Sequence, residues 1–129
     1  MNAVDTNILA RFLLRDDAEQ YRLAVSVLTG GAFVPLSVLM ETAWLLGSRY
    51  RQPRDAVVAA LRTVMSISGV VIEAAPHINW ALARFEAGAD IADVIRLVAA
   101  RDMPAFVTFD RALVRLAGPD SPVPIETLG

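Results

Sequence analysis

Short apolar runs alternate with longer helical patterns along this chain of 129 residues, and this alternation limits the possible folds most strongly. Each run is too short for a helix, and several are rich in β-branched side chains. The predicted strands are residues 3–4, 32–34, 70–72, 105–109 and 123–125. The predicted helices are 6–15, 17–28, one capped by Ser37 and running to 49, 53–68, 77–87, 91–101 and a short one beginning at Asp110. Because parallel strands need crossover helices, this order favours an α/β fold with a parallel sheet and helices on both faces.

The composition is consistent with one cytoplasmic domain, residues 1–129, without a membrane partner. Hydrophobic residues make up 55% of the chain, but no run of about 20 apolar residues could cross a bilayer. The start of the chain lacks the basic and apolar segments of a signal peptide. With no cysteine, disulfide bonds and thiolate metal sites are excluded.

The charge pattern argues against indiscriminate binding to nucleic acid but allows an RNA substrate. The formal net charge is −2, and all 12 basic residues are arginines. A net negative chain is not drawn to phosphate polymers as a whole. The planar guanidinium is nevertheless the better donor to individual phosphates, so the bias towards arginine is compatible with an RNA substrate.

Several acidic side chains occur at positions that an α/β fold would bring close together in space. Asp5 and Asp110 each follow a predicted strand directly, and the carboxyl ends of parallel strands meet at one edge of the sheet. Glu41 is the only charged residue between Leu23 and Ser48. In addition, Asp90 and Asp93 lie about one turn apart on the opening turn of a predicted helix.

Each of these acids also has a purely structural interpretation. Asp5, Asp90 and Asp110 could cap the helices that follow them, and Glu41 could pair with an arginine such as Arg11. Four carboxylates at one sheet edge are harder to explain in this way. Crowded carboxylates raise one another's pKa unless a cation intervenes, and Mg²⁺ takes oxygen ligands of this kind. The chemistry indicated is metal-assisted hydrolysis of a phosphodiester or a phosphate ester.

Four motifs carry these acids in order along the chain. They are VDTNILARFLL with Asp5, VPLSVLMETAWLL with Glu41, GADIADVIRLVAA with Asp93, and FVTFDRAL with Asp110. In this order the chain resembles a PIN domain and, more narrowly, a VapC-type ribonuclease toxin of a type II toxin–antitoxin system. The resemblance implies a three-layer α/β/α sandwich and an endoribonuclease that depends on Mg²⁺ or Mn²⁺. It also implies a cognate small antitoxin and a toxin homodimer.

The resemblance assigns a role to each acid and to its neighbours. Asp5, Glu41, Asp93 and Asp110 would form the catalytic quartet, with Asp5, Asp93 and Asp110 as metal ligands. Glu41 would orient the attacking water or hold a second metal ion. The supporting residues would be Thr6 and Asn7 for Asp5, and Thr108 for Asp110.

The third acid remains open between two residues. The spacing from Asp93 to Asp110 is about one residue shorter than in the family, so Asp90 is an alternative to Asp93. Arg96 stands where many members of the subgroup have a histidine shortly after the third acid.

Two other protein classes compete with this interpretation. A receiver domain of signalling proteins also binds metal through clustered acids, but it needs a lysine, which this chain lacks. A catalytically degenerate PIN fold that only binds protein or RNA is the alternative that remains. The helical spacing of Trp44 and Trp80 predicts core or dimer contacts rather than stacking surfaces for bases.

Overall fold

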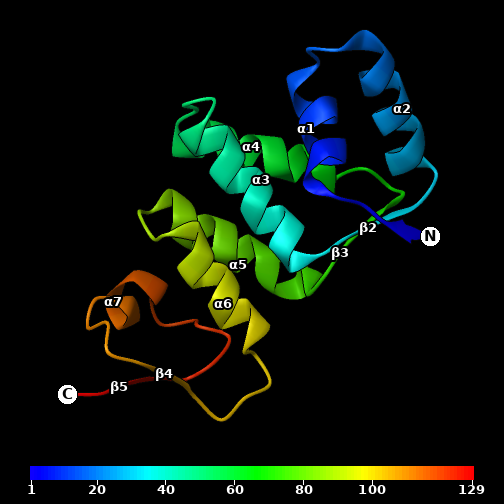
Figure 1. The fold of residues 1–129 in the computed structure, drawn as a ribbon. Coiled ribbons are helices and arrows are strands. Elements are labelled where there is room, and N and C mark those ends of the chain that lie inside the picture. The colour runs from blue at the N-terminus through cyan, green and yellow to red at the C-terminus, as the bar shows by residue number, and fades with distance from the viewer. The chain divides into compact units, whose positions relative to one another are not determined.

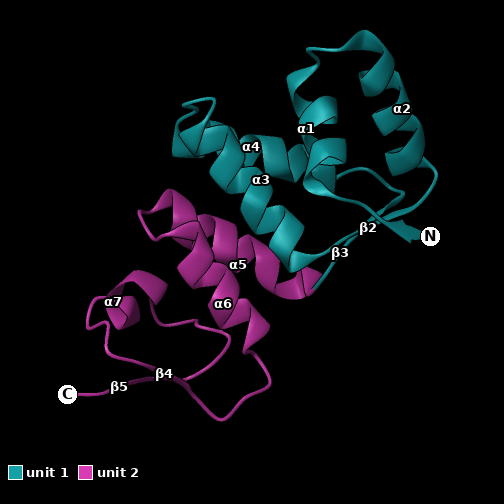
Figure 2. Ribbon diagram, in the orientation of Figure 1, with its two compact units in different colours: residues 1–73 teal, residues 74–129 magenta.

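The computed structural model describes all residues from 1 to 129 and consists of two compact units. Unit 1 comprises residues 1–73 and unit 2 residues 74–129 (Figure 2). Each unit contains its own parallel sheet and its own helices (Figure 1). The expectation of an α/β fold with parallel strands is therefore confirmed. The expectation of one sheet is wrong, because the strand before Asp5 and the strand before Asp110 belong to different sheets.

Unit 1 is built on a three-stranded parallel sheet in the order β1-β2-β3. The strands are β1 (Asn2–Ala3), β2 (Ala32–Val34) and β3 (Val70–Ile72). The first crossover contains α1 (Thr6–Leu14) and α2 (Ala18–Thr29), and the second contains α3 (Leu36–Ser48) and α4 (Arg54–Met65). The predicted bounds of β2 and β3 are confirmed, and β1 begins one residue earlier than expected.

The helix starts of unit 1 follow from their caps. Asp5 caps α1 by accepting a hydrogen bond from the Ile8 N–H, and Asp17 caps α2 by accepting one from the Gln20 N–H. The prediction that Ser37 caps the third helix is wrong, because α3 already begins at Leu36 after Pro35. Its first N–H, that of Leu36, donates to Glu73 Oε1 at 3.0 Å. A carboxylate distant in sequence thus takes the place of a local cap.

The core of unit 1 is aliphatic. Its fully buried side chains come from the inner faces of the four helices and from β2, and they include Leu9, Leu28, Val34, Leu39, Leu46, Val57 and Leu61. Each such side chain contributes about 1.5–3 kcal/mol when it leaves water. This burial fixes α1, which Asp5 precedes as its N-cap, and α3, which carries Glu41.

Unit 2 contains three helices and a two-stranded parallel sheet. The helices are α5 (Ala75–Glu86), α6 (Ile91–Ala99) and α7 (Leu113–Ala117), and the strands are β4 (Phe106–Thr108) and β5 (Ile125–Thr127). Leu97, Leu113, Ala117 and Val123 form a buried cluster beside this sheet.

The elements of unit 2 differ from their predicted bounds by up to three residues, and the physical reason is clear for two of them. The last strand begins at Ile125 rather than at 123, because Val123 is buried in the core and Pro124 has no N–H to give to a ladder. The last helix begins at Leu113 rather than at Asp110, because Asp110 first forms a turn in which Oδ1 accepts the Ala112 N–H at 2.9 Å. None of the helices in the chain combines the length and the apolar character needed to span a membrane.

Candidate functional site

Asp5 lies where β1 gives way to α1, at the carboxyl end of the strand. Its Oδ1 atom accepts the Ile8 N–H at 3.2 Å, so the capping interpretation of this residue is confirmed. The side chain is exposed. Because a carboxylate offers about four lone-pair sites, one capping bond does not exhaust its capacity as a ligand.

Glu41 projects from α3 and is connected to the start of α1. The buried hydroxyl of Thr6 donates a hydrogen bond to Glu41 Oε1. Thr6 was expected to support Asp5, its sequence neighbour, but its hydroxyl contacts Glu41 instead. The suggested pairing of Glu41 with Arg11 is wrong, because Arg11 Nη1 lies 2.7 Å from Asp16 Oδ1.

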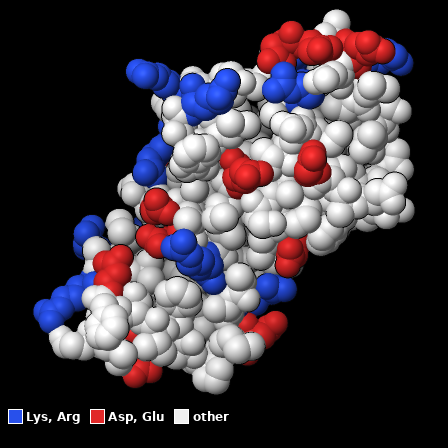
Figure 3. All heavy atoms as spheres, in the orientation of Figure 1, with Lys and Arg blue, Asp and Glu red and all other residues white.

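A cleft of about 320 Å³ in unit 1 brings the first two acids together. Its lining consists of Asp5, Thr6, Asn7, Glu41, Trp44 and Leu45. Asp5 and Asn7 also border a second pocket of about 440 Å³, which is lined by parts of α1 and α2 and includes Arg11. Figure 3 shows two separate acidic groups over α3 and the start of α1, each surrounded by uncharged atoms. Unit 1 therefore presents two carboxylates to one shared cleft.

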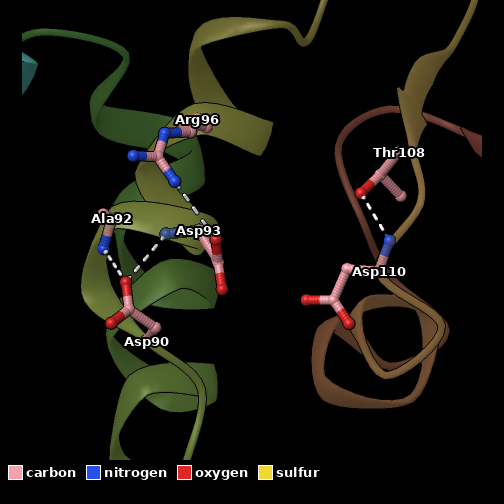
Figure 4. Close-up of polar contacts among 6 residues, drawn as sticks. All are labelled: Asp90, Ala92, Asp93, Arg96, Thr108 and Asp110. Carbon is pink, nitrogen blue, oxygen red and sulfur yellow. Dashed lines mark hydrogen bonds and ion pairs between the residues drawn. The ribbon is translucent and has the colours of Figure 1, made fainter.

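In unit 2 the two candidates for the third acid have different surroundings. Asp90 caps α6, and its Oδ1 accepts the N–H groups of Ala92 at 2.8 Å and Asp93 at 3.3 Å (Figure 4). The capping interpretation of Asp90 is confirmed by these two bonds. The side chain of Asp93 makes no capping bond, and its Oδ1 lies 3.2 Å from Arg96 Nη1.

The surroundings of Asp93 disfavour its negative charge. Burial raises its pKa above the ordinary value, and the negative charges of Asp90 and Asp110 add to this effect. The charge and the hydrogen bond of Arg96 act in the opposite direction without cancelling it. The carboxylates of Asp90 and Asp110 thus lie close enough to Asp93 to raise its pKa, as expected for a site in which several acids lie near one another.

Asp110 follows β4 and is held by one bond of its backbone and one of its carboxylate. Its N–H donates to Thr108 Oγ1 at 3.0 Å, and its Oδ1 accepts the Ala112 N–H at 2.9 Å. Thr108 was expected to support Asp110, and it does so through the main chain rather than through the carboxylate. In Figure 4 the carboxylate of Asp110 points towards the part of α6 that carries Asp93.

The acids of each unit have the chemistry that a hard divalent cation requires. Within neither unit do three acidic or histidine side chains gather closely enough to enclose an ion by themselves. Mg²⁺ does not need such a cage, because it keeps several waters and binds through one or two carboxylates. Asp5 with Glu41, and Asp93 with Asp110, therefore fit this ion by their donor type.

The family model for the PIN domain matches residues 3–119, a segment that contains all four acids and parts of both units. The chain belongs to the PIN domain family. PIN domains are generally nucleases and usually bind Mg²⁺ or Mn²⁺. A comparison with curated proteins gives no match.

One residue of the PIN domain cleft was assigned differently from the sequence. Trp44 was predicted to be a core or dimer contact. The core assignment is wrong, because the residue is 60% exposed and lines the cleft with Asp5 and Glu41. The sequence feature that could have placed Trp44 beside Glu41 is its spacing. Glu41 lies three positions earlier, and residues three apart on a helix share a face.

Proposed function

We propose that this PIN domain is an endoribonuclease that uses Mg²⁺ or Mn²⁺ to hydrolyse phosphodiester bonds in cellular RNA. The observation that carries the proposal is the cleft of unit 1, where Asp5 and Glu41 face the same space. The family match supports it, because the remaining two acids of the PIN pattern, Asp93 and Asp110, are present as carboxylates with exposed or half-buried side chains.

The four acids would have two tasks in hydrolysis, holding the metal ion and orienting the attacking water. Asp5, Asp93 and Asp110 would hold the metal ion, which supplies Lewis acidity towards the phosphate and lowers the pKa of a bound water. Glu41 would orient the attacking water by accepting a hydrogen bond from it, or would hold a second ion. The Thr6 hydroxyl fixes Glu41 for this task, since a hydrogen bond restricts the otherwise mobile carboxylate.

The narrower part of the proposal is the biological role. Four motifs in order resemble the VapC-type toxins, so we infer a toxin that a small cognate antitoxin neutralises and that acts as a homodimer in the cytoplasm. Exposed apolar side chains support an interaction with protein partners, because Leu23 and Val27 lie one turn apart on α2 and are both exposed.

Cleavage of total bacterial RNA by purified protein tests the chemistry. The wild type should cut RNA internally with Mg²⁺ or Mn²⁺ and stop in excess EDTA. Asp5→Asn should lower the rate by orders of magnitude, because the amide loses the charge that holds the ion. Asparagine caps helices as well as aspartate does, so this variant should keep its fold.

The matched control is Asp102→Asn, which removes one exposed carboxylate of a loop outside the four motifs. It should cut RNA at the wild-type rate. Undiminished cleavage in EDTA would contradict the metal-dependent mechanism. A folded wild type without any cleavage would instead favour the alternative, a degenerate PIN domain that only binds.

A further inference from the structure

Trp44 occupies an unusual position for a tryptophan. It lies on α3 one turn after Glu41, and the residue is 60% exposed. The next residue, Leu45, is half-buried and continues the apolar part of the same cleft wall. An indole in such a position exposes a large aromatic surface to water beside two candidate catalytic carboxylates.

The rest of the cleft restricts what can rest on this surface. The lining contains Asp5 and Glu41 but no lysine, arginine or histidine. A phosphate group therefore has a positive partner there only through a cation that the carboxylates hold, whereas a neutral, planar ring meets no charge penalty against the indole. Asn7 adds an exposed amide that can donate and accept hydrogen bonds at the cleft wall. The volume of about 320 Å³ lies within the range of ligand pockets.

From these features we propose that Trp44 stacks against an unpaired base of single-stranded RNA and so positions the neighbouring phosphodiester at Asp5 and Glu41. This inference rests on the proposed function. Aromatic side chains stack on bases of any sequence, but only where the base is free of its duplex partners. Trp44 is thus a positioning residue that selects unpaired segments of RNA and fixes the register of the strand in the cleft.

Fluorescence can observe this stacking directly, because the chain has only two tryptophans. The second, Trp80, is half-buried against the core of unit 2, and its buried indole N–H has no hydrogen-bond partner. Trp80→Phe consequently loses no hydrogen bond. In an Asp5→Asn background that leaves RNA intact, Trp80→Phe reports on Trp44 alone and Trp44→Phe reports on Trp80 alone.

A mixed-sequence single-stranded RNA of about 12 nucleotides is the probe. It should quench Trp44 fluorescence in the first variant and leave Trp80 fluorescence unchanged in the second. The same RNA annealed to its complement should quench neither. Equal quenching by single-stranded and duplex RNA, or no quenching of Trp44, would overturn the proposal.

Affinity gives a second measurement on the same Asp5→Asn protein. Trp44→Ala should weaken binding of the single-stranded probe by about 5- to 150-fold, the loss that corresponds to one stacked base. Trp44→Phe should recover part of that loss. The control is Tyr50→Ala, which removes an exposed aromatic ring beyond the end of α3 and should change the affinity little.

If something other than an RNA base covers Trp44, the experiments give different results. If Trp44→Ala changes the oligomeric state in sedimentation equilibrium and RNA leaves Trp44 unquenched, the indole is a contact between copies and the proposal is wrong. If the wild type cuts RNA but Trp44 is not quenched, stacking fails while the proposed function stands. If Trp44 is quenched but no RNA is cut, stacking stands in a protein that only binds RNA.

Discussion

Several carboxylates of this chain make a structural hydrogen bond and still have free lone pairs that could bind a metal ion or a water. Asp5 and Asp110 each accept a hydrogen bond from a nearby backbone N–H through one carboxylate oxygen, and Glu41 accepts one from Thr6. Such bonds fix the direction of a carboxylate, because its rotamer is no longer free. The choice between cap and catalytic acid is therefore not exclusive for these residues.

Asp93 provides a prediction at the same scale, from the direction of its pKa shift. Its pKa in the folded state is raised above the ordinary value of 3.8, chiefly by burial. Between the two pKa values the folded state binds more protons than the unfolded state, so the free energy of unfolding falls as the pH rises through this window. The fall is complete above the folded pKa. Asp93→Asn cannot titrate and should show a higher urea midpoint than the wild type near pH 7 in EDTA, but no gain below pH 3.8.

The comparison needs a control for the loss of any negative charge. Asp102→Asn removes an exposed acid of the same unit and should shift the midpoint less. A lower midpoint of Asp93→Asn near pH 7 would mean that the ion pair with Arg96 and the helix dipole outweigh the burial of the charge.

At the scale of elements, the sequence was informative wherever the determining residue was local. Asp5, Asp17 and Asp90 stand directly before apolar helical patterns, and the three helices start after them as their spacing indicates. The start of α3 was missed because its first N–H is accepted by Glu73, which lies 37 positions away. The Thr6–Glu41 bond joins residues 35 apart and was missed for the same reason. Contacts of this range depend on packing that no local pattern reports.

The cap of α6 yields a prediction that separates Asp90 from Asp93 as the third acid. Asp90→Ala should lower the free energy of unfolding by about 1 kcal/mol, because two N–H groups lose their acceptor. Asp90→Asn should restore the cap and leave both stability and RNA cleavage near the wild type. Under the same conditions Asp93→Asn should lose cleavage. A stable Asp90→Asn protein that cannot cut RNA would make Asp90 the third acid.

For the molecule as a whole, fold class could be predicted more fully than the site. The alternation of strands and helices is a property of the entire chain, and the family match over residues 3–119 agrees with it. The exposure of Trp44 could not be predicted in this way, since a helical spacing states which residues share a face but not whether that face is covered. The net charge of the sequence likewise does not tell where charged side chains lie on the surface. In Figure 3 acidic and basic groups are interspersed over the face in view.

Growth of cells that express the chain tests the proposed role of the whole molecule. Wild-type protein produced without an antitoxin should arrest growth, because uncontrolled cleavage of cellular RNA stops protein synthesis. Asp5→Asn should not, since it keeps the cap of α1 but loses the charge of a proposed metal ligand. Asp102→Asn carries the same change in charge outside the four motifs and should arrest growth like the wild type. Immunoblots must show equal amounts of the three proteins. Equal growth of all three strains would contradict the toxin role, and the RNA cleavage assay would then decide between a nuclease of another role and a module that only binds.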